Sequence, residues 1–445
     1  MYRISMVSLG CSKNLIDSEL MMGILKNKEY EIIEDCSKAD IIIINTCGFI
    51  DKAKEESINT ILELSEFKDS GNCKCLIVSG CLTQRYKEEI LDELPEVDAI
   101  LGTGNIQEIS EIVEEALEGN RVAKFGDINT DYQEDIKREI ITPMYSSYIK
   151  ISEGCDNHCT YCIIPKLRGK YRSRTMDSII TEAKNLVENG TKEIILIAQD
   201  TSKYGIDLYG EFKLPELLDE LNKIDGLEWI RILYIYPETF TDELILSMKR
   251  NEKVLHYVDI PIQHISDRIL KLMNRDTDRK SINELINKLR KEIPDIIIRT
   301  TLIVGFPGET EKDFDILKDF ISEIKFDRLG VFTYSKEENT AAARLPNHIS
   351  DEVKEERRVE LMKIQEGISS RLCKKSIGNK YDVLIEEYLE DGLYIGRTYM
   401  DSPEIDGIVY VDSDRELNIG DLLKVKIKDG LEYDLIGDVF YEFSK

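Results

Sequence analysis

Three cysteines that lie close together in the sequence have the spacing of a metal site. They are Cys155, Cys159 and Cys162, in a Cys-x3-Cys-x2-Cys run. A structural zinc site is normally closed by four ligands, whereas an iron–sulfur cluster held by three cysteines leaves one iron open for a small molecule. His158 is the alternative fourth zinc ligand, but it directly precedes Cys159, which is poor geometry for chelating one ion. The run therefore favours an open iron–sulfur cluster over zinc.

Three further cysteines share a position relative to predicted strands. The strand-like runs are residues 4–10, 41–46 and 75–80, and the cysteines that directly follow them are Cys11, Cys47 and Cys81. Helix-like stretches at 15–26 and 52–66 separate the runs, which indicates a parallel sheet. The carboxyl ends of parallel strands meet at one edge, where such sheets bind ligands. We therefore expect a second three-thiol site, with small buried hydrophobic residues as the alternative. The remaining cysteines lack this placement and are expected to be structural: Cys36, Cys73, Cys75 and Cys373.

The middle of the chain alternates between apolar strands and helical stretches. The predicted strands are residues 148–151, 194–197, 229–233, 257–260, 296–303 and 330–333. Six strand–helix units suit a partial barrel of the (β/α) kind, whose chemistry lies at the carboxyl ends of the strands. The first cysteine run follows the first of these strands, as that arrangement requires.

Polar residues on the barrel strands and after them are candidate contacts for a cofactor. The candidates are Gln199, Asp200, Gln263, Arg299, Gly305 and Glu309. For each of them a loop or capping role is the alternative, and the glycines in 305–310 could serve only the turn. That stretch is no phosphate loop, because it lacks the lysine and the glycine spacing. His264 could be a satisfied histidine without a chemical role.

A basic run at 166–174 includes Tyr171 and could contact a phosphate backbone. The alternative is a solvated loop that enters a helix. We favour the solvated loop, because the rest of the chain argues against nucleic acid.

The C-terminal part begins with a charged helical connector at 350–375. The strand-like runs after it are residues 381–385, 393–397, 407–411, 422–427 and 434–439, which suggest a small barrel. Residues 376–445 hold 7 Lys and Arg against 17 Asp and Glu, and residues 1–135 hold 13 against 28. Such a barrel would mostly repel RNA and should attract a basic partner, unless its acidity only aids solubility.

The chain has 445 residues, 42% of them hydrophobic, which is enough for two or three domains with cores. No run approaches the roughly 18 apolar residues of a membrane helix, and the N-terminus leads into a strand-like stretch rather than a signal peptide. We therefore expect a cytoplasmic protein with no membrane association. In that reducing compartment ten cysteines indicate metal binding or catalysis rather than disulfides.

Together these features resemble the methylthiotransferase family of the radical S-adenosylmethionine superfamily along essentially the whole chain. The motifs that carry the resemblance are SLGCSKNLIDSE at 8–19, NTCGFI at 45–50 and QDTSKYG at 199–205. They look like the branch that acts on a ribosomal protein. The tRNA-modifying branch typically reads Gly-Cys-Gln-Met-Asn where this chain has Gly-Cys-Ser-Lys-Asn, and its barrel is usually basic. Ser12 departs from the proline that is frequent in the first branch, at a position outside the presumed ligands.

The resemblance implies an α/β protein in three parts. Residues 1–118 would form an open parallel α/β sheet domain with an auxiliary cluster. Residues 141–371 would form the radical S-adenosylmethionine core, a partial (β/α)6 barrel, and residues 374–442 a small all-β TRAM barrel.

The implied cofactors are two [4Fe-4S] clusters and S-adenosyl-L-methionine. The cluster on Cys155, Cys159 and Cys162 would receive an electron from a donor protein and cleave the cofactor to a 5′-deoxyadenosyl radical. The radical would take a hydrogen from the β-carbon of an aspartate in small-subunit ribosomal protein S12, free or on the ribosome. The cluster on Cys11, Cys47 and Cys81 would supply the sulfur, a second cofactor molecule would supply the methyl group, and no RNA substrate is expected.

Two other functions remain open. One is a tRNA adenosine methylthiotransferase, which would share both clusters and bind tRNA with a steep salt dependence. The other is a non-catalytic iron–sulfur or zinc module that binds ribosomes.

Overall fold

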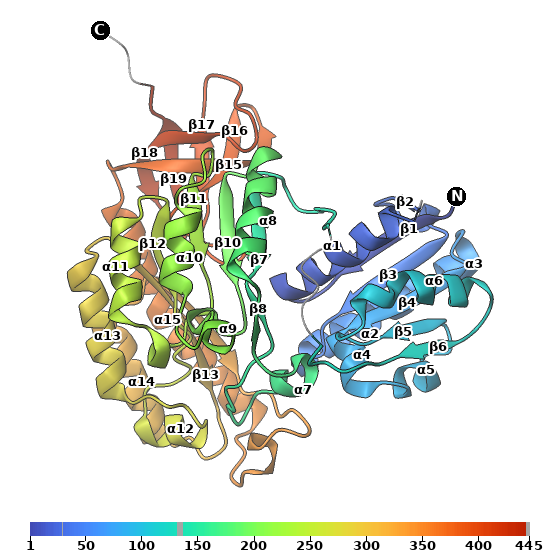
Figure 1. Cartoon of the computed structure of the whole chain (residues 1–445). Helices are drawn as coiled ribbons and strands as arrows, with labels where there is room; N and C mark the ends of the chain where they lie inside the picture. Colours follow the sequence, from blue (N-terminus) through green and yellow to red (C-terminus); the bar gives the residue numbers. More distant parts are fainter. Residues whose placement is uncertain (29, 131–136, 442–445) are drawn as a thin grey trace.

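The computed structural model describes residues 1–28, 30–130 and 137–441. The expected end of the third domain, residue 442, lies outside the described residues. Three parts follow one another along the chain, and each has its own sheet or barrel (Figure 1). This confirms the expected fold class, an open parallel sheet followed by a partial barrel and a small β-barrel. Within the described ranges, no helix combines the length and the apolar character needed to cross a bilayer.

The first part is a six-stranded parallel sheet with strand order β2-β1-β3-β4-β5-β6. Its strands are β1 Arg3–Ser8, β2 Glu31–Ile32, β3 Ile41–Thr46, β4 Cys75–Gly80, β5 Ala99–Leu101 and β6 Val122–Lys124. Its helices are α1 Ser12–Lys26, α2 Asp51–Ser65, α3 Phe67–Ser70, α4 Cys81–Tyr86, α5 Glu89–Glu93 and α6 Ile109–Leu117. The three predicted strands are β1, β3 and β4, which pair as neighbours. The strands that the sequence did not predict are β2, β5 and β6, each of two or three residues.

Helices cover both faces of this sheet, which explains the unbroken isoleucine run of β3. Ile41 and Ile43 pack in one hydrophobic cluster with residues of α1 and α6. Ile42 and Ile44 pack in another cluster, with residues of α2, α4 and α5. A strand buried on both faces shows no polar alternation.

The second part is a parallel sheet with strand order β14-β13-β12-β11-β10-β7. Its strands are β7 Ser146–Lys150, β10 Glu193–Ile197, β11 Trp229–Ile232, β12 Val254–Asp259, β13 Ile297–Val304 and β14 Arg328–Thr333, with a separate ribbon of β8 Ser152–Glu153 and β9 Arg172–Ser173. Its helices are α7 Ile164–Arg168, α8 Met176–Glu188, α9 Ile206–Tyr209, α10 Leu214–Leu221, α11 Asp242–Arg250, α12 Asp267–Leu272, α13 Arg279–Glu292 and α14 Glu311–Ile324. All six predicted strands are present.

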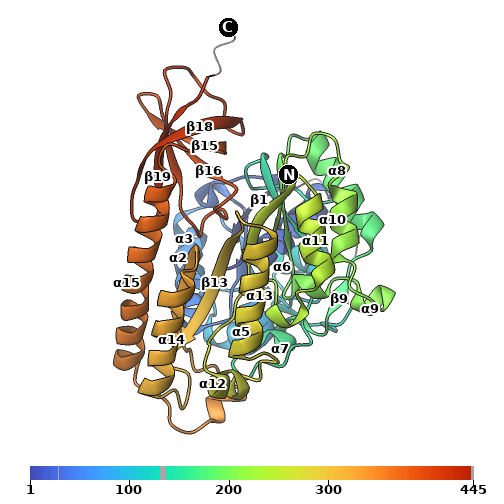
Figure 2. The same cartoon turned by 90° about the vertical axis from the view of Figure 1, so that its left-hand side faces the viewer.

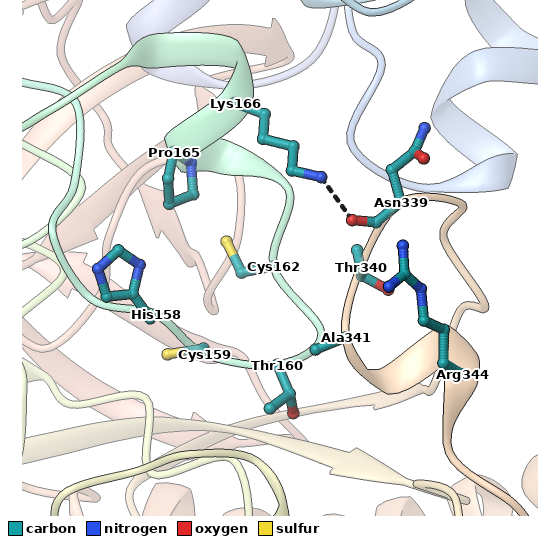
Figure 3. A pocket seen from close by; sticks show the side chains of 10 residues that line it. All are labelled: His158, Cys159, Thr160, Cys162, Pro165, Lys166, Asn339, Thr340, Ala341 and Arg344. Atoms are coloured by element: carbon teal, nitrogen blue, oxygen red, sulfur yellow. Dashed lines mark hydrogen bonds between the residues drawn. The ribbon is translucent and has the colours of Figure 1, made fainter.

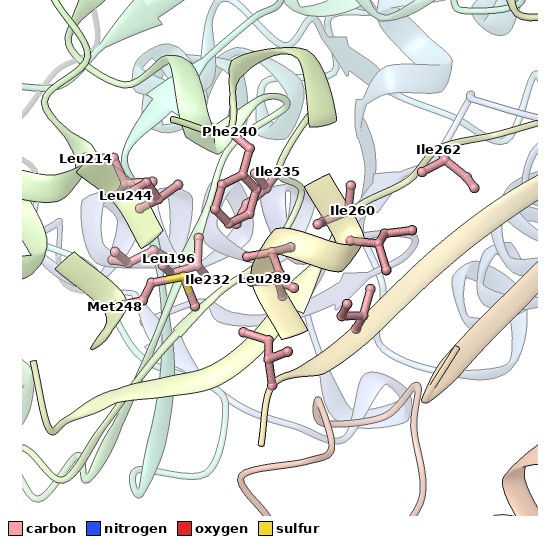
Figure 4. Packing of buried hydrophobic residues seen from close by; sticks show 14 of the residues in the cluster. Leu196, Leu214, Ile232, Ile235, Phe240, Leu244, Met248, Ile260, Ile262 and Leu289 are labelled. Carbon is pink, nitrogen blue, oxygen red and sulfur yellow. The ribbon is translucent and has the colours of Figure 1, made fainter. Parts of the chain in front are cut away.

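The core of this part lies between the sheet and its outer helices. Leu196 of β10 and Ile232 of β11 pack there with Leu244 and Met248 of α11 and Leu289 of α13 (Figure 4). Alternate residues of the same strands face the other side, where Ile195, Trp229 and others belong to a second cluster. The sheet therefore has an inner face that other parts of the chain can cover.

Helix α15, Asp351–Lys375, packs beside α14 and leads to the closed C-terminal barrel (Figure 2). The barrel has strand order β15-β16-β17-β19-β18, with β15 Lys380–Glu390, β16 Leu393–Thr398, β17 Val409–Asp412, β18 Leu422–Gly430 and β19 Leu435–Val439. All five predicted strands are present. The inner-face cluster of the second part continues into the barrel through Val383 and Tyr394.

A buried ion network joins the barrel to the central sheet. Glu193, the first residue of β10, accepts hydrogen bonds from Arg231 at 2.8 Å and from Arg397 of β16 at 3.1 Å. All three side chains are fully buried. Burial alone would raise the pKa of Glu193, but Arg397 and Arg231 lower it to about 2. Because Glu193 begins its strand, the barrel covers the amino ends of the sheet and leaves the carboxyl ends free for a site.

We predict that Glu193→Gln lowers the free energy of unfolding by about 3 to 5 kcal/mol, because it leaves two buried arginines without their anion. In the parent protein this contribution is fully present above the ordinary pKa of 4.5 and disappears as the pH falls toward 2. Guanidinium unfolding at several pH values measures both effects. Asp382→Asn, in the exposed pair with Lys424, is the matched control and should cost at most about 1 kcal/mol. Equal effects of the two variants would contradict a role for Glu193 in docking the barrel.

Candidate functional site

The structure brings the first three cysteines together at the carboxyl ends of neighbouring strands. Cys11 precedes α1, Cys47 follows β3, and Cys81 follows β4 as the first residue of α4. Burial raises the pKa of Cys47 to about 12, and the nearby Cys81 and Cys11 thiols contribute to the rise. Gly10 packs closely against Cys47, since a Cβ on it would lie 2.7 Å from the Cys47 Cβ. The predicted gathering of these thiols is confirmed, while their role as cluster ligands stays a prediction.

The second three cysteines lie in the loop between β8 and α7. The backbone amide of Asn157 donates to the Cys155 sulfur at 3.4 Å, and that of Ile164 donates to the Cys162 sulfur at 3.4 Å. Burial raises the pKa of Cys155 to about 11 and also raises that of Cys162. The neighbouring Cys159 thiol adds to both shifts, so the three sulfur atoms lie near one another.

Neither set of thiols forms a closed site for one ion. In the part of the chain that the structure describes, no three His, Cys, Asp or Glu side chains are placed to hold a single metal ion. His158, the alternative zinc ligand, is exposed. Three thiols without a fourth protein ligand match an iron–sulfur cluster with one open iron, and the identity of the bound group stays a prediction.

A cavity of about 310 Å³ opens beside the second set (Figure 3). Cys159, Cys162 and His158 line it from the cluster loop, and Thr340 and Arg344 line it from the segment after β14. Lys166 closes one side by donating to the Asn339 carbonyl at 2.7 Å. The cavity gives small molecules access to the thiols of this loop.

The cluster loop is anchored on the turn that follows α12. Thr160 donates through its amide to the Met273 carbonyl at 3.0 Å and through its hydroxyl to the Leu272 carbonyl at 2.8 Å. Asn274 donates to the His158 carbonyl at 2.9 Å. These contacts fix the backbone on both sides of Cys159.

Of the candidate cofactor contacts, Asp200 lies nearest to the cluster loop. Its carboxylate accepts from the Asn157 side chain at 2.8 Å, and its carbonyl accepts from the Tyr171 hydroxyl at 3.0 Å. Burial raises the pKa of Asp200. Gln199, at the carboxyl end of β10, is part-exposed. Gln263 has a positive φ of 67° and bridges to β13 through its backbone.

Glu309 stabilises the turn that begins at Gly305. The Glu309 carboxylate accepts from the Gly305 amide at 2.8 Å and from Arg357 of α15 at 2.8 Å. Burial raises the pKa of Glu309 to about 7, although Arg357 opposes the rise. His264 is buried, its Nδ1 accepts from the Ser266 amide at 2.9 Å, and burial lowers its pKa to about 3. The Nε2 of His264 is buried and has no hydrogen-bond partner among the described residues, so the interpretation of His264 as a satisfied histidine is wrong.

Arg299 lies away from the cluster loop. It is the third residue of β13 and pairs with Asp259 at 2.7 Å and with Asp406 of the C-terminal barrel at 3.3 Å. These bonds direct its guanidinium toward the barrel. Its role as a cofactor contact stays a prediction, as do those of the five other candidates.

The interpretation of the basic run as a solvated loop is wrong for its central residues. Arg168 is only 3% exposed, and Tyr171 and Arg174 are buried as well. Arg168 pairs with Asp17 of α1 and with Glu153, and its guanidinium donates to the Asn14 side chain. One of the two carboxylates that neutralise Arg168, Asp17, lies 151 residues away in the sequence, so the residues of the run alone could not show this pairing.

Sequence reasoning therefore missed a four-residue ion network between the first two parts of the chain, which we call the interdomain network: Asp17, Lys150, Glu153 and Arg168. Lys150 donates to Asp17 and to Glu153, each at 2.6 Å. Burial would raise the pKa of Glu153, but Lys150 and Arg168 lower it to about 2. The signal for this network in the sequence was Asp17, a carboxylate in α1 that lies one turn before the buried apolar residues Leu20 and Met21.

The interdomain network brings the two sets of cysteines toward each other. Cys81 of the first set packs in one small buried cluster with Ile163 and Leu167, which follow Cys162 of the second set. Asn14 makes a second link between the first set and α7, since its side-chain oxygen accepts from Arg168 and lies 3.7 Å from the Cys81 sulfur. The first set of thiols thus lies close to the segment that directly follows the second set.

We predict that Asp17→Asn lowers the free energy of unfolding by about 3 to 5 kcal/mol, because two buried cations lose a shared anion. Denaturant unfolding monitored by circular dichroism measures the change. Asp35→Asn is the matched control, since Asp35 is exposed and pairs only with neighbours in its own turn. An Asp17→Asn protein as stable as the control would contradict the importance of the interdomain network.

Comparisons with known proteins agree with this architecture. Residues 3–102 match the model of the uncharacterized protein family UPF0004, residues 149–321 match the radical SAM superfamily, and residues 377–440 match the TRAM domain. Among solved structures, the radical S-adenosylmethionine methyltransferase TsrM from Kitasatospora setae superposes with a TM-score of 0.56 at 13% identity. The match covers 74% of this chain and 73% of TsrM and shows the fold alone.

Curated relatives match over the whole length. The ribosomal protein uS12 methylthiotransferase RimO of Clostridioides difficile (strain 630) is 57% identical over 444 residues, which is 100% of both chains. The protein of the same name from Thermoanaerobacter sp. (strain X514) is 52% identical over 438 residues, 98% of this chain and 100% of the relative. With this similarity from end to end, the chain belongs to the RimO family of radical S-adenosylmethionine methylthiotransferases.

Proposed function

We propose that this protein inserts a methylthio group at the β-carbon of an aspartate in ribosomal protein uS12. The observation that carries the proposal is the packing of Cys81, from one three-cysteine set, against the segment that follows Cys162, from the other set. The full-length similarity to proteins named uS12 methylthiotransferases supports the substrate.

Each set of cysteines would hold one [4Fe-4S] cluster. The set at Cys155, Cys159 and Cys162 would leave one iron open for S-adenosyl-L-methionine, next to Asp200 and the cavity beside the loop. When bound, the two clusters and S-adenosyl-L-methionine would supply the electron that cleaves the cofactor, the radical that takes a hydrogen, and the sulfur and methyl group that are transferred. The further contacts that we propose for the cofactor are Gln199, Gln263, Arg299, Gly305 and Glu309.

This chain's own residues would position the target and exclude water. No side chain is basic enough to deprotonate an unactivated β-carbon, so the difficult chemistry belongs to the cofactors. The interdomain network holds two domains against each other around the target, and a closed site protects a reactive radical from solvent.

The acidic first and third parts suit a basic ribosomal protein, free or on the ribosome. An electron donor would be a further partner, RNA is not proposed as a substrate, and the site of action would be the cytoplasm.

The proposed domains are residues 1–118 with the auxiliary cluster, a core at 141–371 and a TRAM barrel at 374–442.

The two sets of cysteines should be separable by mutation. Cys155→Ala should abolish cleavage of S-adenosylmethionine, whereas Cys47→Ala should leave cleavage measurable but stop sulfur transfer. Each variant should retain about half of the iron of the parent protein after reconstitution, because each set holds one cluster of the same size. Iron analysis and liquid chromatography of 5′-deoxyadenosine measure both effects. Cys36→Ala, outside both sets, is the control, and methylthiolation by the Cys47→Ala protein would refute the two-cluster proposal.

The substrate can be tested in cells with and without this gene. We expect protein uS12 to lose the mass of one methylthio group when the gene is deleted, while the tRNA nucleoside profile stays unchanged. Intact-mass spectrometry of small-subunit proteins and nucleoside chromatography are the two measurements. Loss of a methylthio nucleoside with unchanged uS12 would instead support the tRNA adenosine methylthiotransferase.

A further inference from the structure

Lys13 is a buried cation that reaches from the first domain into the second. It lies in the first turn of α1, and α1 packs between its own sheet and β7 (Figure 1). Lys13 is 4% exposed, and its ammonium lies 3.1 Å from the centre of the Tyr234 ring. Tyr234 follows β11 by two residues and packs against the inner-face cluster. The ammonium of Lys13 is therefore at the carboxyl end of the central sheet, on its inner side.

Among the described residues, no carboxylate forms an ion pair with Lys13. The other buried cations of the interior differ in this respect: Lys150, Arg168, Arg231 and Arg397 each pair with at least one carboxylate. An aromatic face attracts an ammonium, but burying an ammonium without an anion is costly. One carboxylate on the Tyr234 side is already committed, since Asp259 accepts from the Tyr234 amide and pairs with Arg299.

The same turn of α1 contains a second polar group without a partner. The Ser12 hydroxyl is buried and forms no hydrogen bond among the described residues. Cys11, which precedes the helix, provides no side-chain cap, and the first turn of this 15-residue helix has no acidic residue. The unpaired amides at a helix start favour an anion. A buried ammonium, a free hydroxyl and an uncapped helix start thus meet in one turn.

We propose that Lys13 binds the carboxylate of the target aspartate and so positions its β-carbon. The inference rests on the proposed function and adds the residue that selects the substrate. The β-carbon is bonded directly to the carboxylate carbon, so an ammonium that holds the carboxylate also fixes the carbon that reacts. Lys13 is two residues from Cys11, so this anchor lies beside the set of cysteines that would hold the sulfur-supplying cluster. In this role Lys13 is a positioning residue and takes no part in the bond changes.

A double-mutant cycle on binding tests the proposal without turnover. The reconstituted holoenzyme, without reductant, is titrated with purified uS12 and with uS12 in which asparagine replaces the target aspartate. The parent enzyme should bind the aspartate form about tenfold or more tightly, in line with a charge-assisted hydrogen bond. Lys13→Met keeps an unbranched apolar side chain over Tyr234, removes the ammonium, and should bind both forms equally. Lys13→Arg keeps the charge and should retain the preference.

Lys26→Met is the matched control, because Lys26 is exposed at the other end of α1 and pairs with Glu139 at the surface. It should behave as the parent enzyme. Iron content and circular dichroism show whether each variant is folded and loaded. If Lys13→Met fails to fold, Lys13→Arg and the parent preference for aspartate still decide the question: a parent enzyme that binds both forms of uS12 equally overturns the proposal.

Other outcomes separate this proposal from the proposed function. If the parent enzyme methylthiolates uS12 but Lys13→Met keeps the preference for aspartate, the role of Lys13 is wrong and the function stands. If Lys13→Met shifts the midpoint potential of the cluster on Cys11, Cys47 and Cys81 with no loss of preference, Lys13 serves that cluster, which also overturns the proposal. If the parent enzyme neither binds nor modifies uS12, the proposed function itself is wrong.

Discussion

The interdomain network of Asp17, Lys150, Glu153 and Arg168 is the interaction on which the rest of the site depends. Two cations and two carboxylates are buried together, with Asp17 from α1 of the first domain and Lys150, Glu153 and Arg168 from β7, β8 and α7 of the second. Removing any one member would leave a buried charge uncompensated, so the domains have one preferred way to pack. That packing places Cys81 of the first set beside Ile163, which directly follows Cys162 of the second set.

The C-terminal barrel lies at the amino ends of the strands of the central sheet. It pairs with the first residue of β10 through Arg397 and fills the inner face near the amino ends of the strands. Chemistry in a sheet of this kind belongs at the carboxyl ends. The barrel therefore stabilises the core at one end, while the first domain closes the other. An acidic barrel fixed in this way suits a protein substrate better than a phosphate backbone.

Much of this arrangement follows from local patterns. Strands such as β3 and β4 end where apolar runs meet a cysteine, and parallel pairing then forces Cys11, Cys47 and Cys81 to one edge. The short strands β2, β5 and β6 were not predicted, because two or three residues carry no periodic signal. Arg168 was misread for another reason. Its partner Asp17 lies 151 residues away, and composition cannot show which charges a fold brings together. Lys13 was likewise inconspicuous, because only the packing of Tyr234 against it reveals that it is buried without an anion.

The central proposal is that the two sets of cysteines hold two clusters close to each other, and electron paramagnetic resonance of the reduced holoenzyme tests it most directly. Two clusters held by neighbouring loops should interact magnetically. The spectrum of the doubly reduced protein should therefore be broader than the sum of the spectra of the Cys47→Ala and Cys155→Ala proteins. A spectrum equal to that sum would show two independent clusters and would contradict this proposal.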